Sequence, residues 1–173
     1  MANTFTKIAT VTVGSGGAST IDFNSIPATY ADIIIKMSAR TTVSGDFDTF
    51  RMTINSSSGT YTTLLLRAED NAASSTSVTG QAQLRWLGSA EGDTATANTF
   101  GNFEIYIPNY ASSNAKSMSA DHVTEINSST GSYQGLGSGY WSGTAAITDI
   151  SIYQAGYNFK QYSTATLYGI SNS

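Results

Sequence analysis

The sequence ADIIIKMSARTT, residues 31–42, is the stretch that decides the fold class. Its apolar and polar side chains alternate, as they do in a strand whose successive residues point to opposite faces of a sheet. One face would carry Ile33, Ile35 and Met37, and the other would carry Asp32, Ile34, Lys36, Ser38 and Arg40. Residues 31–42 therefore predict a β-strand with one face turned to a core.

The same period of two recurs along the rest of the chain, and no helical pattern extends over ten residues. Further strands are expected at 7–13, 20–23, 50–56, 60–67, 102–108, 117–126, 140–145, 147–153 and 161–170, and residues 83–87 are a candidate for another. Residues 69–80 are rich in Ala, Ser and Thr and predict a surface loop, and 127–139 predict a long excursion rich in Gly and Ser. The run Leu64-Leu65-Leu66 indicates burial on both faces or a helical fragment, because periodicity does not separate the two.

Short strands separated by polar turns are typical of a sandwich or barrel. A parallel sheet would need crossover helices, for which the chain has no room. We therefore expect an all-β protein, an antiparallel β-sandwich of jelly-roll type with about nine or ten strands. The length of 173 residues fits one domain, so residues 1–173 are expected to form a single β-sandwich domain.

The composition favours β structure over disorder. Ser and Thr make up 49 of the 173 residues, and charged residues are 12%, about half the usual share. Disordered chains lack aromatic and β-branched residues, whereas this chain is 40% hydrophobic and 11% aromatic. Thr, Tyr, Ile and Val suit a half-buried pleated surface, and Ser, Gly and Asn suit turns.

Charge and cysteine content exclude several classes of function. The net charge is −4 and no cluster of Lys or Arg occurs, so nucleic acid is not expected as a partner. No apolar run approaches the ~20 residues that span a bilayer, so no membrane is expected either. The absence of cysteine excludes disulfides and thiolate metal sites. No secretory signal is visible at the first residues.

Catalytic and metal-binding patterns are weak in this sequence. The one histidine, His122, is interpreted as a solvated histidine at a loop edge, and no nucleophile elbow accompanies it. Acidic pairs such as Asp46 with Asp48 lie in expected loops, where carboxylates usually keep a surface soluble. The segment Gly45-Asp46-Phe47-Asp48 is the best candidate for calcium, although it lacks EF-hand spacing. We expect no enzyme, no catalytic residue, no cofactor and no metal site.

The aromatic residues are the more informative group, since eight of the ten tyrosines follow residue 100. Tyr and Trp combine a large contact area with a polar tip, which suits subunit interfaces and stacking on sugar rings. A Tyr-rich core is the alternative. The candidate contact residues, for an interface or a glycan, are Tyr110, Tyr133, Tyr140, Trp141 and Tyr157.

The chain contains the stretches TVGSGGA (12–18) with IPATY (26–30), ANTFGN (97–102) with IYIPNY (105–110), and YSTATLYGI (162–170). These stretches resemble small structural proteins of tailed bacteriophages, of which those of cyanophages and other marine phages are examples. The likeness extends from about Thr4 to Ile170. These motifs carry structure rather than chemistry, so the resemblance implies a jelly-roll virion component and transfers no catalytic residue.

The expected function is that of a capsid decoration or cement protein that acts through subunit interfaces. Its partners would be the major capsid protein or tail and fibre subunits. It would form homo-oligomers, trimers among them, because closed symmetry is the norm. The alternative is a tail, fibre or knob attachment protein whose β-sandwich binds a host glycan. In either case the protein would be made in the bacterial cytoplasm and reside on the virion.

Overall fold

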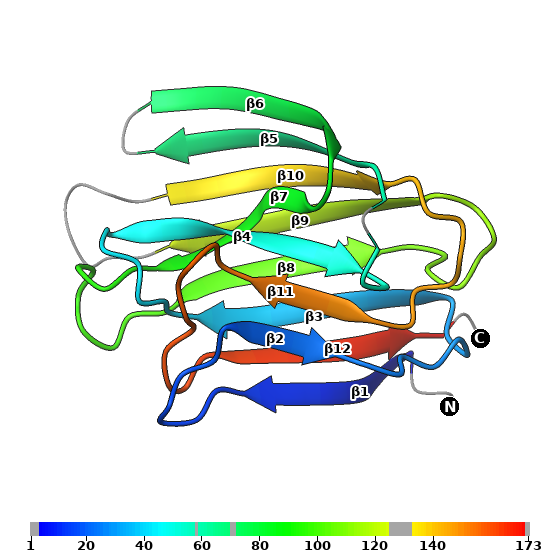
Figure 1. Cartoon of the computed structure of the whole chain (residues 1–173), viewed down its shortest axis with the longest axis horizontal. Coiled ribbons are helices and arrows are strands. Elements are labelled where there is room, and N and C mark those ends of the chain that lie inside the picture. Colours follow the sequence, from blue (N-terminus) through cyan, green and yellow to red (C-terminus); the bar gives the residue numbers. More distant parts are fainter. Residues whose placement is uncertain (1–3, 58, 70–71, 125–132, 172–173) are drawn as a thin grey trace.

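The structure is a computed structural model, and it describes residues 4–57, 59–69, 72–124 and 133–171 (Figure 1). These residues form twelve strands and no helix. The strands are Phe5–Thr12 (β1), Thr20–Phe23 (β2), Asp32–Ala39 (β3), Phe47–Ile54 (β4), Tyr61–Glu69 (β5), Ala72–Gln81 (β6), Leu84–Glu91 (β7), Gly101–Ile107 (β8), Lys116–Thr124 (β9), Tyr133–Trp141 (β10), Ile150–Tyr153 (β11) and Thr164–Ile170 (β12).

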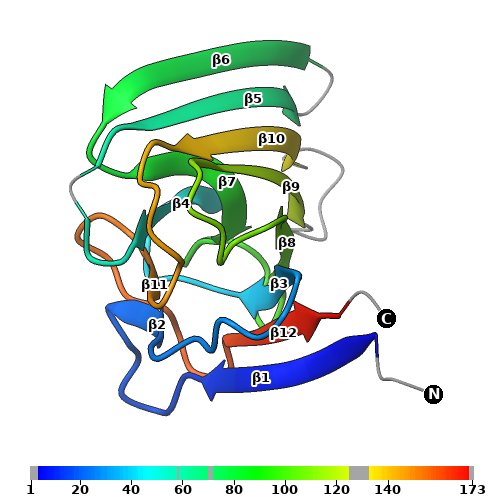
Figure 2. The same ribbon diagram turned by 90° about the vertical axis from the view of Figure 1, so that its right-hand side faces the viewer.

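The strands form a large and a small sheet that pack face to face. The large sheet has eight strands in the order β1-β12-β3-β8-β9-β10-β5-β6, and the small one has four in the order β2-β11-β4-β7. Figure 2 shows the large sheet passing around the small one, with β5 and β6 extending past it. The prediction of an all-β antiparallel sandwich is confirmed. The expected nine or ten strands are too few by at least two.

The alternation read in residues 31–42 sets the position of the core. Ile33, Ile35 and Met37 of β3 are buried between the sheets. Their neighbours in the β3–β8 register are Ile107, Ile105 and Phe103, which are buried on the same face. On the opposite face Lys36 forms an ion pair with Glu104 at 2.5 Å. Strand β3 therefore lies inside the large sheet, between β12 and β8, with its apolar side against the small sheet.

Strand pairing is nested from the ends of the chain inward. Strand β1 pairs with β12, β2 with β11, β3 with β8, and β4 with β7, all antiparallel. The contacts of β12 with β3 and of β11 with β4 then join these pairs within each sheet. The hairpins β5–β6 and β9–β10 are added outside this nested set. Both hairpins extend the large sheet beyond β8.

Two segments expected as loops contain strands. Residues 72–80 of the expected 69–80 loop belong to β6, because small hydroxyl and Ala side chains fit a ladder beside β5. Part of the expected excursion 127–139 is β10, whose glycines at alternate positions face the core. A Cβ on Gly137 would lie 2.9 Å from a Leu87 methyl, and one on Gly139 2.7 Å from Met118 Cγ. The glycines permit close packing of the sheets here. The rest of the excursion, 127–132, lies outside the described residues.

Candidate interaction surface

The outer face of the β9-β10-β5-β6 half of the large sheet exposes an apolar cluster. Strand side chains alternate between faces, and Leu65 points inward with 1% exposure while its two neighbours point outward. The exposed members, called here the leucine face, are Leu64 (53% exposed), Leu66 (63%), Leu136 (65%) and Val123 (43%). Leu66 and Leu136 are directly opposite each other in the β5–β10 register. The expectation that the leucine run is buried on both faces is therefore wrong.

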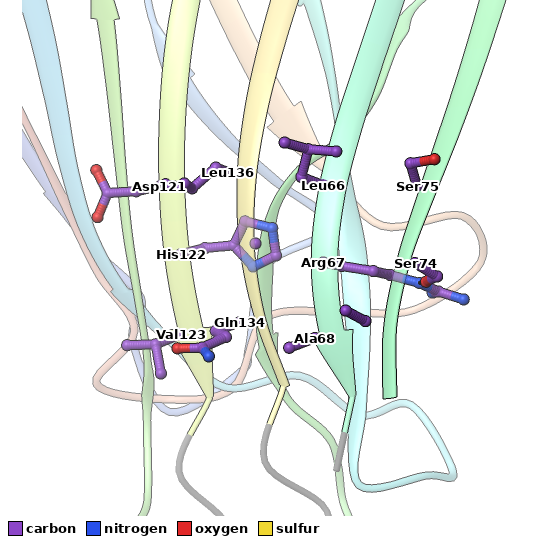
Figure 3. Close-up of a pocket in the computed structure, with 12 residues that line it drawn as sticks. Leu66, Arg67, Ala68, Ser74, Ser75, Asp121, His122, Val123, Gln134 and Leu136 are labelled. Atoms are coloured by element: carbon purple, nitrogen blue, oxygen red, sulfur yellow. The ribbon is translucent and has the colours of Figure 1, made fainter. Parts of the chain in front are cut away.

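The leucine face is hollowed beside these side chains. A hollow of about 780 Å³ spans β9, β10, β5 and β6, and its apolar lining includes Leu66, Leu136 and Val123 (Figure 3). Asp121 and Gln134 add polar groups to the same lining. A second hollow of about 620 Å³ adjoins it along β5, beside Leu64. The buried centre of a protein–protein interface is more apolar than the rest of a protein's surface.

A buried polar group lies on the inner side of the same strands. His122 of β9 is 3% exposed, and its Nδ1 lies 2.7 Å from Ser89 Oγ of β7. Its ring stacks on Tyr133 at a centroid distance of 5.3 Å, and Tyr133 in turn stacks on Phe47 at 4.2 Å. The interpretation of His122 as a solvated loop histidine is wrong, because the strand places it against β7. Although its side chain is 3% exposed, His122 is among the residues that line the hollow of about 780 Å³.

Burial lowers the pKa of His122 to about 4. In the unfolded chain the pKa of His122 has its ordinary value near 6.5. Above that pH the histidine is neutral in both states, so the protonation of His122 does not reduce the free energy of unfolding. The free energy of unfolding is lowered as the pH falls through 6.5 towards 4. We expect a loss of about 3 kcal/mol between about pH 7 and pH 4 from this residue alone. Urea unfolding of the His122→Gln variant and the parent protein across this pH range tests this prediction. Protonation of carboxylates affects the stability of both proteins equally, so the difference between them reports on His122. Equal pH slopes for the two would contradict the assignment.

The five predicted contact residues divide between core and surface. Tyr110, Tyr133 and Trp141 are at most 2% exposed and belong to the interior. The Tyr110 hydroxyl donates to Pro27 O, and Trp141 stacks on Tyr61 at 6.5 Å. Tyr140 and Tyr157 are exposed. Tyr140 follows Leu136 by four residues on β10 and so lies on the same outer side as the leucine face.

The leucine face was not predicted from the sequence, although β10 carries a usable signal. Leu136 stands between two glycines, and glycines that permit close sheet packing must point inward. A residue between them must then point outward. For Leu64 and Leu66 no such signal exists, because three consecutive leucines suit a strand buried on both faces equally well.

The acidic segment considered for calcium is engaged in local contacts. Asp46 Oδ1 accepts a hydrogen bond from Thr94 Oγ1 at 2.8 Å, and Asp48 Oδ1 accepts one from the Thr49 amide at 2.7 Å. Burial raises the pKa of Asp48. Within the described ranges, no three His, Cys, Asp or Glu side chains gather in a way that could hold a metal ion.

Comparison with known proteins adds no family to this geometry. No protein-family model matches the chain. No curated protein is significantly similar to it in sequence. None of the residues that the structure describes forms a helix long and apolar enough to cross a membrane. The leucine face is therefore the feature on which a function can be argued.

Proposed function

We propose that this chain is a non-enzymatic structural protein of a tailed bacteriophage virion, of the capsid decoration or cement type. The observation that carries the proposal is the leucine face. Single exposed apolar residues are ordinary, but three leucines and a valine gathered over neighbouring strands mark a contact site for another protein. The occupant of the leucine face is an apolar patch on a neighbouring virion subunit.

The nested strand pairing supports the jelly-roll form of this proposal. Pairs β1–β12, β2–β11, β3–β8 and β4–β7 are those of one long antiparallel hairpin. Folding that hairpin over itself places β12 beside β3 and β11 beside β4, as observed. The result is the four-strand orders β1-β12-β3-β8 and β2-β11-β4-β7. Two facing sheets wound in this way are the arrangement of jelly rolls, which are common in viral capsid proteins.

The surface chemistry fits a protein that is free before it assembles. The net charge of −4 and the many exposed Ser and Thr residues keep the unassembled chain in solution. Covering the leucine face then removes apolar surface from water, which stabilises the contact with the neighbouring subunit. Tyr140, beside the leucine face, adds aromatic area with a hydroxyl that can hydrogen-bond at the rim.

Immunogold electron microscopy of purified phage particles tests the proposal. Antibody against this chain should label the head evenly if it decorates the capsid. Label confined to tail or fibre tips would overturn the decoration role in favour of the attachment role. Particles without label, with an antibody that binds the isolated protein, would overturn virion residence altogether.

A specific observation favours the attachment role as the second candidate. Tyr162 is 68% exposed with φ 73°, in the left-handed region that disfavours a bulky residue. It borders a hollow of about 560 Å³ that Asn98, Asn158 and Gln161 also line. An open aromatic ring beside amide groups suits a neutral sugar. If this role holds, Tyr162→Ala should abolish binding on a glycan array, and equal binding by the parent and the variant would contradict it.

A further inference from the structure

Strand β6 is an open sheet edge of unusual composition. It is the last strand of the large sheet, ten residues long, and pairs with β5 alone. Its sequence AASSTSVTGQ contains no charged residue and no proline, and none of its residues is buried. The register with β5 is regular from Ala72 to Val78 and shifts only near Tyr61, at the end of the strand. Such a strand presents free backbone donors and acceptors along a straight line.

The other three sheet edges carry the features that prevent pairing with another chain. Strand β1 has Lys7 and a register shift beside it. Strand β2 is only four residues long and contains Asp22. Strand β7 is irregular at Trp86, whose φ is 61°, and one of its ends is covered where Thr41 N donates to Glu91 O. Charges, shortness, bulges and cover are the usual protections of natural edges. Among the described edges, β6 alone has a stretch, Ala72–Val78, that is free of all of them.

We propose that β6 pairs antiparallel with β6 of a second copy of this chain. A two-fold axis perpendicular to the sheet makes the strand its own partner, and this isologous contact joins the two eight-stranded sheets into one. Within the described residues, no other sheet edge of either copy is as open to such pairing. Assembly therefore stops at a dimer, whereas pairing of β6 with β1 would continue into a fibre.

Charge explains why two copies meet at this strand. Each chain carries a net charge of −4, so two copies repel over most of their surfaces. Over Ala72–Gln81 no charged residue exists to oppose its counterpart in any register. The small side chains also permit close approach from both sides. The charged side chains of the neighbouring strand β5, Arg67 and Glu69, are partners of each other at 3.8 Å.

The dimer also joins the leucine faces of the two copies into one surface. This part of the inference rests on the proposed function. A two-fold axis perpendicular to the sheet keeps both outer faces on one side. With strands about 4.8 Å apart, the two β5 strands would lie about 14 Å from each other. The leucines of both copies then border one broad surface, with Ser75 and Ser77 of the β6 strands between them. Such a surface doubles the apolar contact offered to a virion neighbour.

Sedimentation velocity over a protein concentration of about 1 μM to 1 mM measures the self-association. The parent protein should sediment as a monomer–dimer equilibrium. In the variant Ser75→Lys/Ser77→Lys, which changes two of the exposed positions of β6, lysines of the two copies would lie beside each other. We expect a fall of roughly tenfold or more in the association constant. The matched control is Thr10→Lys/Thr12→Lys on β1, which adds the same charge to the opposite edge and should dimerise like the parent.

Amide hydrogen exchange separates strand pairing from contact through the leucine face. In the dimer, the outward-pointing amides of Ala72–Val78 should gain protection that is lost on dilution and in the β6 lysine variant. A parent protein that is monomeric throughout, a trimer, or a dimer without protection in β6 would each overturn the pairing. A monomer that immunogold still finds on the capsid would overturn the dimer and leave the proposed function. If the protein formed the β6 dimer but immunogold found none on the particles, the proposed function would be overturned and the dimer would stand.

Discussion

Replacing Arg40 with alanine should lower the free energy of unfolding by about 3 to 5 kcal/mol. The Arg40 side chain follows β3 and is only 6% exposed. Its guanidinium donates to the main-chain oxygens of Thr96 at 2.6 Å and Ala95 at 2.7 Å. It also donates to the main-chain oxygen of Thr99 at 3.2 Å. Alanine would remove this donor from all three carbonyls, although Thr99 Oγ1 would still donate to Thr96 O, and would free the segment between β7 and β8.

Two variants make the Arg40 prediction specific. Arg85→Ala removes the same charge from a half-buried side chain that lies over the Trp86 ring at 5.9 Å, and should cost about 1 kcal/mol or less. Arg40→Lys keeps the charge but lacks the planar fork that reaches several carbonyls, so it should fall between the two. Urea unfolding followed by circular dichroism gives all three values. If the Arg40→Ala variant were no less stable than the Arg85→Ala variant, the stabilising role of the Arg40 hydrogen bonds would be refuted.

The sequence predicted strands best where one face is polar and the other apolar. The alternation in 31–42 identified the inward residues of β3, because a single-sided pattern has only one stable orientation against a core. Alternation in residues 102–108 predicted β8 for the same reason. The triplet Leu64-Leu65-Leu66 offered no such asymmetry. In the structure Leu65 is the buried member of the triplet, and Leu64 and Leu66 face water because they lie on the outer face of the large sheet.

Local composition misled the prediction where long-range packing overrides it. Residues 72–81 consist of types common in loops, yet they pair with β5 over most of their length. Gly135, Gly137 and Gly139 are turn residues by composition, yet a side chain at Gly137 would collide with Leu87 across the sheets. Neither neighbour is near in sequence. Such pairings are determined by topology, which a single sequence does not display.

Buried polar groups were also beyond prediction from the sequence. Lys116 is 1% exposed, and its ammonium donates to main-chain oxygens of Ser112, Asn114 and Ala145. Burial lowers the pKa of this lysine. Charged residues are almost never fully buried unless partners surround them, so exposure was the default expectation. Those partners come from loops that meet only in the folded chain.

Replacing Leu66 and Leu136 together with serine should abolish attachment to the particle and leave the fold intact. Both side chains are mostly exposed, so their loss creates no cavity in the core. If a neighbouring subunit covers them, each leucine contributes about 1.5 to 3 kcal/mol of apolar burial to the contact. The pair then accounts for about 3 to 6 kcal/mol, which is a fall in affinity of at least a hundredfold.

Particles assembled without this protein are the substrate for the measurement. Purified parent and Leu66→Ser/Leu136→Ser proteins are added to them, and bound copies per particle are counted on gels after sedimentation. The matched control is Phe5→Ser/Tyr162→Ser, which removes two exposed apolar side chains, 54% and 68% exposed, away from the leucine face. It should bind like the parent, and thermal unfolding should be unchanged in both variants. If the leucine variant bound the particles as fully as the control does, burial of Leu66 and Leu136 would contribute nothing to attachment. The contact would then lie elsewhere on the molecule.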